Sequence, residues 1–375
     1  MKMLETPFTT KILQFGVILL LLSVQTLFAA DFESDKSSNL PNSKLKLRQT
    51  EKLQAGKIRL MQLKGGEKHV FTVDATAENC LRFVIEQQGI DVAITVSEAD
   101  GKIVKKTDRP SGSYGRETVT LIAPRTGVLT IEIETVLPNA VAGKYQISYT
   151  QNNAPTDADR LRDTAENLTA EGETLRSEGS MEDKKKALEK FSEALKIWQN
   201  LGDLYEQAVV LYGIGFAYNG LSNFYEAALF FNRSLRLFSE IKDEFGKAIN
   251  YAALGSVQYP VNENDFAVYN YKKAIEIYRK MDNSRGLGIA FHGLGTVEML
   301  LEKHDEAIAD LSESLRWRVL ANDNTGKART HITLGKLYLF LKSYDQAEKQ
   351  FSEAEKSLGE KRAKKDAELL YYWGK

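Results

Sequence analysis

The chain has 375 residues, of which 43% are hydrophobic and 27% are charged, and this balance is typical of folded proteins with two or three domains. Its 50 basic and 51 acidic residues nearly cancel, which argues against a nucleic-acid-binding protein, since such proteins usually carry a strongly basic face or domain. Cys80 is the only cysteine, so no internal disulfide can form and the fold must rely on its hydrophobic cores.

The first 30 residues have the pattern of a secretory signal peptide. Lys2 and Lys11 accompany the apolar residues 12–22, and an Ala-Ala pair precedes the acidic sequence DFESD. The apolar stretch is shorter than the roughly 20 residues that a membrane-spanning helix needs. We therefore expect cleavage near Ala30 and a secreted or periplasmic protein. Because Phe28 stands where the cleavage pattern prefers a small residue, an uncleaved N-terminal membrane anchor is the alternative.

Residues 31–50 are polar and show no periodic pattern, which predicts a flexible leader. From residue 51 to residue 150, short runs rich in β-branched residues alternate with turn segments. The runs are HVFTV, CLRFVIE, DVAITV, KIVKK, TVTLIA, GVLTIEIE and KYQISY. Seven or eight short strands at this spacing predict an antiparallel β-sandwich. In the sixth run, Leu129, Ile131 and Ile133 form an apolar face that we expect to lie in the core.

The stretch LRFVIEQQGIDVAITVSEADGKI, residues 81–103, resembles the jelly-roll module of bacterial pre-peptidase C-terminal domains, and GKYQISY resembles its final strand. The resemblance implies a non-catalytic accessory domain. Cys80 is expected to be buried in a strand. His69 lies on a neighbouring predicted strand and could pair with the Cys80 thiolate, but nothing nearby predicts the oxyanion donors that such a pair needs.

Residues 151–158, QNNAPTDA, form the predicted linker to a second domain, residues 159–375, in which the sequence repeats every 40 residues. The repeated positions include a glycine, an alanine and an aromatic or large apolar residue four places after the alanine. The glycines are Gly215, Gly255, Gly295 and Gly335, and the alanines are Ala187, Ala227, Ala267, Ala307 and Ala347. Asp203, Asp243, Asn283 and Asp323 recur as predicted helix N-caps. Each unit is thus a predicted helical hairpin, with about five units of which the last is incomplete.

This pattern resembles the tetratricopeptide repeat, with Leu211, Gly215, Tyr218, Ala227 and Phe231 in the positions of its motif. The resemblance implies an α-solenoid. Gln258 and Glu298 depart from the motif, because they replace the aromatic residue found at Tyr218 and Tyr338. Gly295, in the stretch FHGLGTVEML, is expected to permit close helix packing and not to bind phosphate, since no predicted strand precedes it. Pro260 should end its helix early.

The resemblance also implies a concave surface that holds a hydrophobic peptide or helix. The residues that line this surface are expected three positions before, one position after and four positions after each repeated glycine. The candidate partner contacts are Tyr212, Phe216, Asn219, Ser256, Tyr259, His292, Thr296, Met299, Lys336 and Leu339. The alternative is that these side chains pack against neighbouring repeats.

The sequence predicts neither an enzyme nor a metal or cofactor site. His304 and His331 occupy packing positions of the repeat, and no His or Cys cluster has ligand spacing. A sandwich followed by repeats resembles the front part of bacterial CHAT (caspase-like) proteins, which implies a scaffold for a protein or peptide partner, with a peptidase domain encoded downstream. Because residues 363–375 correspond to the start of another unit, we expect that the chain is a fragment or that its C-terminal end docks onto a partner. A carbohydrate- or envelope-binding sandwich with the repeats as a spacer is the second hypothesis.

Overall fold

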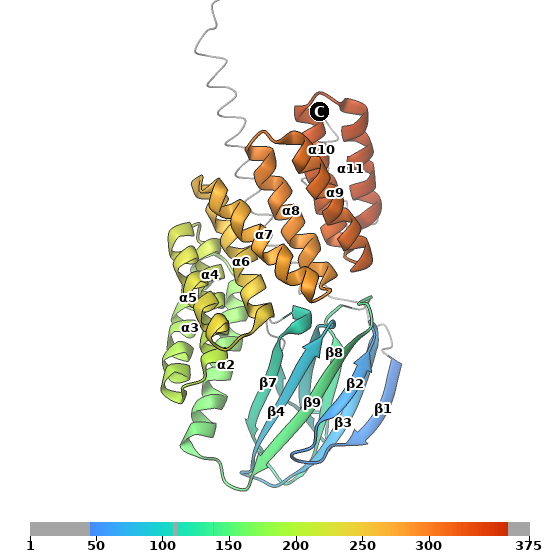
Figure 1. Ribbon diagram of the computed structural model, residues 1–375. Coiled ribbons are helices and arrows are strands. Elements are labelled where there is room, and N and C mark those ends of the chain that lie inside the picture. Colours follow the sequence, from blue (N-terminus) through green and yellow to red (C-terminus); the bar gives the residue numbers. More distant parts are fainter. Residues whose placement is uncertain (1–45, 108–111, 138, 359–375) are drawn as a thin grey trace, which may run out of the picture.

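The computed structural model describes residues 46–107, 112–137 and 139–358. It contains a β-sandwich followed by a curved stack of helical hairpins (Figure 1). The predicted signal peptide, residues 31–45 of the predicted leader and the predicted C-terminal helix start lie outside the described residues. Within the described part, no helix combines the length and apolar character that crossing a membrane requires.

The sandwich consists of a five-stranded sheet with the order β1-β3-β8-β5-β6 and a four-stranded sheet with the order β2-β9-β4-β7. The strands are β1 (Lys46–Lys52), β2 (Arg59–Leu63), β3 (Glu67–Ala75), β4 (Cys80–Gln88), β5 (Val92–Glu98), β6 (Ile103–Thr107), β7 (Arg116–Ile122), β8 (Gly127–Thr135) and β9 (Gly143–Asn152), with a short 3₁₀ helix η1 (Gly112–Tyr114) before β7. The core lies between the sheets. Leu129, Ile131 and Ile133 of β8 are buried as predicted, whereas Val128 is exposed.

Three features of the sandwich differ from expectation. Strand β2 is not among the predicted runs, since its sequence RLMQL has no β-branched residue. Residues 46–50, predicted as leader, belong to β1, which pairs in parallel with β3 through contacts such as Glu51 with Phe71. All other strand pairs in the described part of the chain are antiparallel. The predicted linker is also shorter, because β9 continues to Asn152 and the first helix begins at Asp157. Thr156 caps that helix, and its hydroxyl and Asp159 form a reciprocal capping box.

Ten helices form five hairpins in the described part of the repeat domain. They are α2 (Asp157–Glu178), α3 (Met181–Leu201), α4 (Leu204–Gly220), α5 (Phe224–Glu240), α6 (Glu244–Gln258), α7 (Asn264–Lys280), α8 (Ser284–Leu300), α9 (His304–Leu320), α10 (Asn324–Phe340) and α11 (Tyr344–Leu358). The predicted caps Asp203, Asp243, Asn283 and Asp323 each accept a backbone hydrogen bond at the start of a helix. The α-solenoid with its 40-residue period is thereby confirmed.

The repeated glycines lie where the two helices of a hairpin meet. A Cβ atom at Gly215 would lie 2.5 Å from Cε1 of Phe231, and one at Gly295 would lie 2.9 Å from Cγ of Leu311. Gly255 and Gly335 face Tyr271 and Phe351 in the same way. The large side chain on the second helix thus fills the space that glycine leaves on the first, which confirms the predicted packing role of Gly295.

Pro260 shortens one repeat as predicted. Helix α6 ends at Gln258, and a 3₁₀ helix η2 (Tyr259–Val261) follows, whereas the corresponding helix α4 continues to Gly220. The proline ring blocks the next helical turn, and its missing N–H removes one backbone donor.

Candidate functional site at the junction of sandwich and repeats

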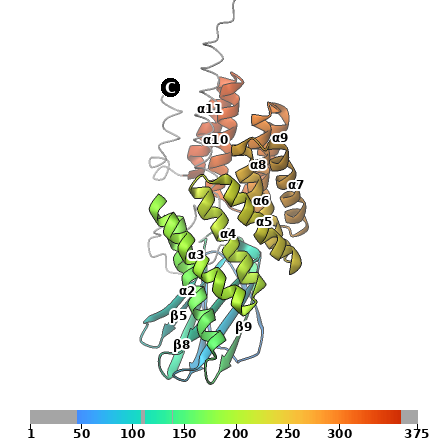
Figure 2. The same cartoon turned by 90° about the vertical axis from the view of Figure 1, so that its left-hand side faces the viewer.

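The sandwich is fixed to the first helix of the repeats by a buried polar cluster. Glu166 of α2 is 4% exposed, and it accepts hydrogen bonds from the backbone N–H of Thr120, at 2.7 Å, and from the Thr120 hydroxyl, at 2.9 Å. Lys105 of β6 forms ion pairs with Glu166 and Asp163. Strands β6 and β7 therefore present a hydrogen-bonded edge to α2, which runs beside the sandwich (Figure 2).

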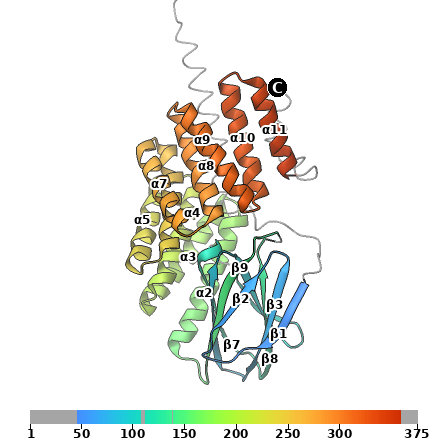
Figure 3. The same cartoon turned by 45° about the vertical axis from the view of Figure 1, so that its right-hand side comes forward.

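Aromatic side chains make the second set of contacts. The backbone N–H of Arg116 donates to the Tyr205 hydroxyl at 2.8 Å, and the Arg116 guanidinium lies 4.8 Å from the centre of the Tyr205 ring. The Tyr114 hydroxyl donates to the carbonyl of Met281 at 3.1 Å, and the Tyr114 ring lies 5.9 Å from that of Phe245. The sandwich thus touches the loops at the lower edge of the repeats in the view of Figure 3.

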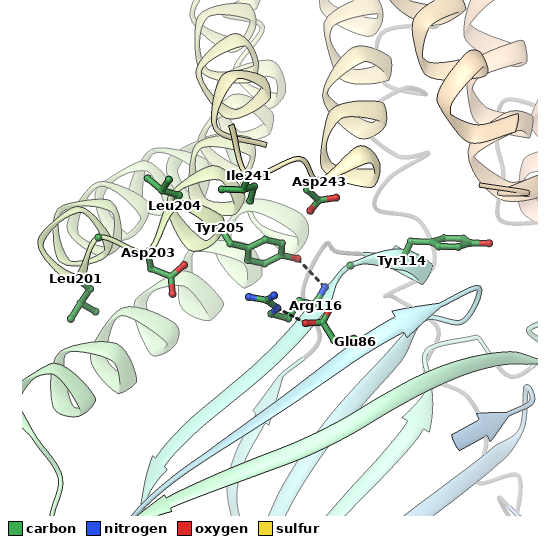
Figure 4. A pocket seen from close by; sticks show the side chains of 11 residues that line it. Glu86, Tyr114, Arg116, Leu201, Asp203, Leu204, Tyr205, Ile241 and Asp243 are labelled. Atoms are coloured by element: carbon green, nitrogen blue, oxygen red, sulfur yellow. Dashed lines mark hydrogen bonds and ion pairs between the residues drawn. The ribbon is translucent and has the colours of Figure 1, made fainter. Parts of the chain in front are cut away.

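An open cavity of about 620 Å³ lies between these contacts (Figure 4). Its lining comes from both domains: from β4, the η1–β7 segment, the α3–α4 turn and the α5–α6 turn. The lining residues are Glu86, Tyr114, Gly115, Arg116, Leu201, Gly202, Asp203, Leu204, Tyr205, Ile241 and Asp243. Asp203 and Asp243 therefore do more than cap their helices, because they also line the cavity.

The cavity carries both signs of charge. Nε of Arg116 donates to Glu86 at 2.9 Å. Burial works to lower the pKa of Arg116, but the neighbouring Glu86 carboxylate outweighs burial and raises it. Burial raises the pKa of Asp243, although hydrogen bonds from the backbone of Gly246 and Phe245 oppose the shift. A mixed, partly desolvated wall of this kind suits a polar segment better than a purely apolar one.

Most of the predicted groove residues are not open to a partner in this structure. Seven of the ten are less than 9% exposed, and three are half-buried. The buried ones are Tyr212, Phe216, Ser256, Tyr259, His292, Thr296 and Lys336, and the half-buried ones are Asn219, Met299 and Leu339. The structure thus favours the packing alternative for the seven.

Individual contacts show how these side chains pack. The rings of Tyr212 and Phe216 meet edge to face at 4.8 Å, and the Arg176 guanidinium of α2 lies 5.5 Å from the centre of the Phe216 ring. Nδ1 of His292 lies 3.2 Å from the hydroxyl of Thr330 on α10. Neighbouring helices therefore occupy the space that a bound peptide would need at these positions.

The other histidines and the cysteine are structural. His69 and Cys80 do not lie on adjacent strands, because β3 belongs to the five-stranded sheet and β4 to the four-stranded sheet. His69 Nδ1 lies 2.6 Å from the Tyr145 hydroxyl, and burial raises the pKa of the Cys80 thiol to about 11. His304 contacts Phe340, and His331 contacts Gln350. Among the described residues, no group of three or more His, Cys, Asp or Glu could hold a metal ion.

The sequence did not reveal the cavity, because its walls come from distant segments. Arg116 and Tyr205 are 89 positions apart and belong to no shared motif. The available signals were small: Tyr114 is an aromatic residue in a long loop of the sandwich, and Asp203 recurs with the repeat.

Comparisons with known proteins agree with the repeat assignment. Residues 287–358, which lie in α8 to α11, match the model of the tetratricopeptide repeat family. No curated protein matches the chain. The aspartyl phosphate phosphatase F of Bacillus subtilis has a similar structure, with 11% identity and a TM-score of 0.49, and the match covers 57% of this chain and 54% of that chain.

A Rap protein complexed with competence and sporulation factor is 14% identical, with a TM-score of 0.47, and the match covers 58% of each chain. The chain thus spans little more than half the length of these two proteins. The pre-peptidase C-terminal domain of a collagenase from Bacillus anthracis is 12% identical, with a TM-score of 0.23, and the match covers 30% of this chain and 100% of that domain.

Proposed function

We propose that this protein is a non-catalytic scaffold that binds a peptide or helical segment of a protein partner. The stack of five hairpins, four of which are closed by the same glycine contact, is the observation that carries the proposal. Stacked repeats bury a continuous core and leave extended surfaces for partners. The match to the tetratricopeptide repeat family supports the same reading of the helices.

The junction cavity is the place where we expect the partner to enter. Its volume of about 620 Å³ falls in the range of about 300 to 1,000 Å³ that is usual for binding pockets. Tyr114 and Tyr205 offer ring surface, while Arg116 and Asp243 offer charged hydrogen-bonding groups. Of the predicted groove residues, Asn219, Met299 and Leu339 stay candidates for further contacts outside the cavity, since they lie partly exposed near the C-terminal ends of α4, α8 and α10.

The cellular setting is proposed from the sequence resemblances. The signal-like residues 1–30 support a bacterial envelope or secreted location, and the order of sandwich and repeats supports a role as the front part of a CHAT-type peptidase system. The spacer hypothesis has less support, because Glu166 and Lys105 hold the repeats directly against the sandwich. A downstream coding sequence for a peptidase domain, or mass spectrometry of a mature N-terminus at Asp31, would test the setting.

Selection of binders from a random peptide display library on the immobilised protein would test the scaffold function. Leu204→Trp should fill the cavity and abolish the binding of those selected peptides that occupy it. Glu244→Trp is the matched control, because Glu244 begins α6 as Leu204 begins α4 but does not line the cavity. Equal binding to both variants by every selected peptide would exclude the cavity as the partner site.

A further inference from the structure

Four large apolar side chains stand exposed on two neighbouring hairpins. Tyr225 and Leu229 of α5 are 68% and 57% exposed, and Phe266 and Tyr269 of α7 are 62% and 54% exposed. We call these four residues the outer patch. Tyr225, Leu229 and Tyr269 lie on the sides of α5 and α7 opposite to the buried alanine and aromatic residues of the repeat motif, and Phe266 lies at the flank of α7, so the packing of the hairpins leaves all four exposed.

The repeat supplies its own comparison for these positions. Positions that correspond to Tyr225 and Leu229 are also exposed in the other second helices, but most carry charged residues there. The corresponding residues are Lys185 and Glu189 on α3, Asp265 and Tyr269 on α7, Asp305 and Ala309 on α9, and Asp345 and Lys349 on α11, while Phe266 corresponds to Glu226 on α5. Because the fold tolerates polar residues at these sites, the packing of the hairpins does not require the apolar ones on α5 and α7.

Charge at the next helical turn distinguishes the same two helices. Four residues after Leu229 and Tyr269, the chain has Arg233 and Lys273, whereas α3, α9 and α11 have Glu193, Glu313 and Glu353 at that position. Arg233 lies 5.1 Å from the centre of the Phe230 ring, and Lys273 lies 5.9 Å from that of the Tyr269 ring. Residues four apart share a helix face, so Leu229 and Tyr269 each have a basic neighbour on the C-terminal side. On α7 this neighbour, Lys273, also pairs with Glu276 at 3.4 Å, and Asp265 lies four residues before Tyr269.

We propose that the outer patch docks an acidic amphipathic helix of another protein. Apolar residues of that helix would cover Leu229 and Tyr269, and Asp or Glu residues beside them would face Arg233 and Lys273. A second copy of this chain fits less well, because symmetric pairing of the patch would bring the basic residues of both copies together.

The outer patch is separate from the junction cavity. Ile241, which lines the cavity, follows the last residue of α5, whereas Tyr225 and Leu229 lie in its first half. At 1.5 Å per residue, Leu229 is about 18 Å from Ile241 along the helix. On α7, Phe266 and Tyr269 likewise lie in the first half of the helix, whereas Met281, which follows its last residue, contacts the sandwich.

A display library of helix-forming peptides with randomised surface positions, selected on the full chain, would test the proposal. Enriched peptides should combine an apolar stripe with Asp and Glu. Their affinity should fall about tenfold or more for the double variant Leu229→Glu, Tyr269→Glu, and also for Arg233→Glu, Lys273→Glu. Added salt should weaken binding, because the charges are exposed.

Two controls keep this result apart from the cavity. Ala309→Glu places the same change on α9 and should leave binding intact, and Leu204→Trp, which fills the cavity, should also leave it intact. Circular dichroism of each variant checks the fold. The proposal is overturned if enriched peptides are not acidic, if none is enriched, or if they bind the Leu229→Glu, Tyr269→Glu protein equally well. If sedimentation shows that the wild type is a dimer and the Leu229→Glu, Tyr269→Glu variant is a monomer, the partner of the outer patch is a second copy of this chain and not an acidic helix.

Discussion

Gly295 shows how single residues set the distance between helices. Alanine is the better helix former by about 1 kcal/mol, but a Cβ at this position would lie 3.1 Å from the carbonyl oxygen of Ala307 and 3.2 Å from the backbone nitrogen of Leu311. Backbone atoms cannot move aside as a flexible side chain can. The cost of overpacking, about 1 to 3 kcal/mol, should therefore exceed the gain in helix propensity.

We predict that Gly295→Ala lowers the free energy of unfolding by about 1 to 2 kcal/mol, measured by urea denaturation. Gly220→Ala is the matched control. Its Cβ would meet only the Cε and Cδ atoms of Lys184, which can swing away, so this variant should be neutral or slightly stabilising. A loss of stability in Gly220→Ala equal to that in Gly295→Ala would contradict the packing argument.

Glu298 and Asp310 form a carboxyl pair where the two preceding repeats have neutral groups. One repeat earlier, the Asn270 amide donates to Gln258 at 2.6 Å, and two repeats earlier the rings of Tyr218 and Phe230 stack. Burial and the nearby Asp310 raise the pKa of Glu298 to about 7, and burial also raises the pKa of Asp310. The folded protein thus holds a proton at this pair that the unfolded chain releases.

We predict that stability falls as pH rises from about 4.5 to 7, by about 1 to 3 kcal/mol. The sign follows because the folded state binds more protons than the unfolded state in this window, so deprotonation favours unfolding. Glu298→Gln keeps a hydrogen-bond donor but cannot titrate, and it should reduce this pH dependence and stabilise the protein at pH 8. Thermal unfolding of both proteins at pH 5 and pH 8 provides the measurement. An unchanged pH dependence in Glu298→Gln would show that other groups cause it.

Among the helices, α2 joins the two domains through Glu166. Removal of this carboxylate would leave the N–H of Thr120 without its acceptor and Lys105 with one fewer partner. Buried groups that lose their partners cost more than exposed ones. The stability of the junction therefore depends on Glu166, which the sequence does not distinguish from the exposed acidic residues of the same helix.

Glu166→Ala should lower the free energy of unfolding by about 2 to 4 kcal/mol and make the segment between β9 and α2 sensitive to limited proteolysis. Glu171→Ala serves as the control on the same helix, since the ion pair of Glu171 with Lys190 is largely exposed and worth less than about 1 kcal/mol. If both variants resist proteolysis as the wild type does, Glu166 does not hold the junction.

The elements themselves could be predicted well where a period is repeated. The 40-residue repeat identified the N-caps and the helix-packing glycines, and alternation identified seven strands. Strands β1 and β2 were missed. The partner of β1, β3, is parallel and non-local, and β2 is mostly exposed and has no β-branched residue. The groove residues were placed by resemblance, but the burial of Tyr212 and His292 depends on the curvature of the stack, which the repeat motif does not encode.

On the scale of the whole molecule, the junction extends over most of the repeat domain. Contacts run from Glu166 on α2, through Tyr205 on α4, to Met281 before α8 and Asn322 before α10. The sandwich thus touches successive hairpins along one edge. Repeat stacks ordinarily contact only their neighbours and can flex, so this edge contact should fix the curvature of the stack.

The last prediction follows from this edge contact. The sandwich, residues 46–152, has its own core, and so have the repeats, so each part should fold alone but melt lower than in the full chain. We expect a decrease of about 5 °C for the repeats, since about 1 kcal/mol shifts melting by several degrees. Calorimetry of both parts and of the full chain measures this. Mixing the separate parts should recover some of the loss, because the junction contacts can re-form. Identical melting temperatures alone and together would mean that the sandwich lies beside the repeats without stabilising them, and the cavity between them would then have no fixed shape for a partner to recognise.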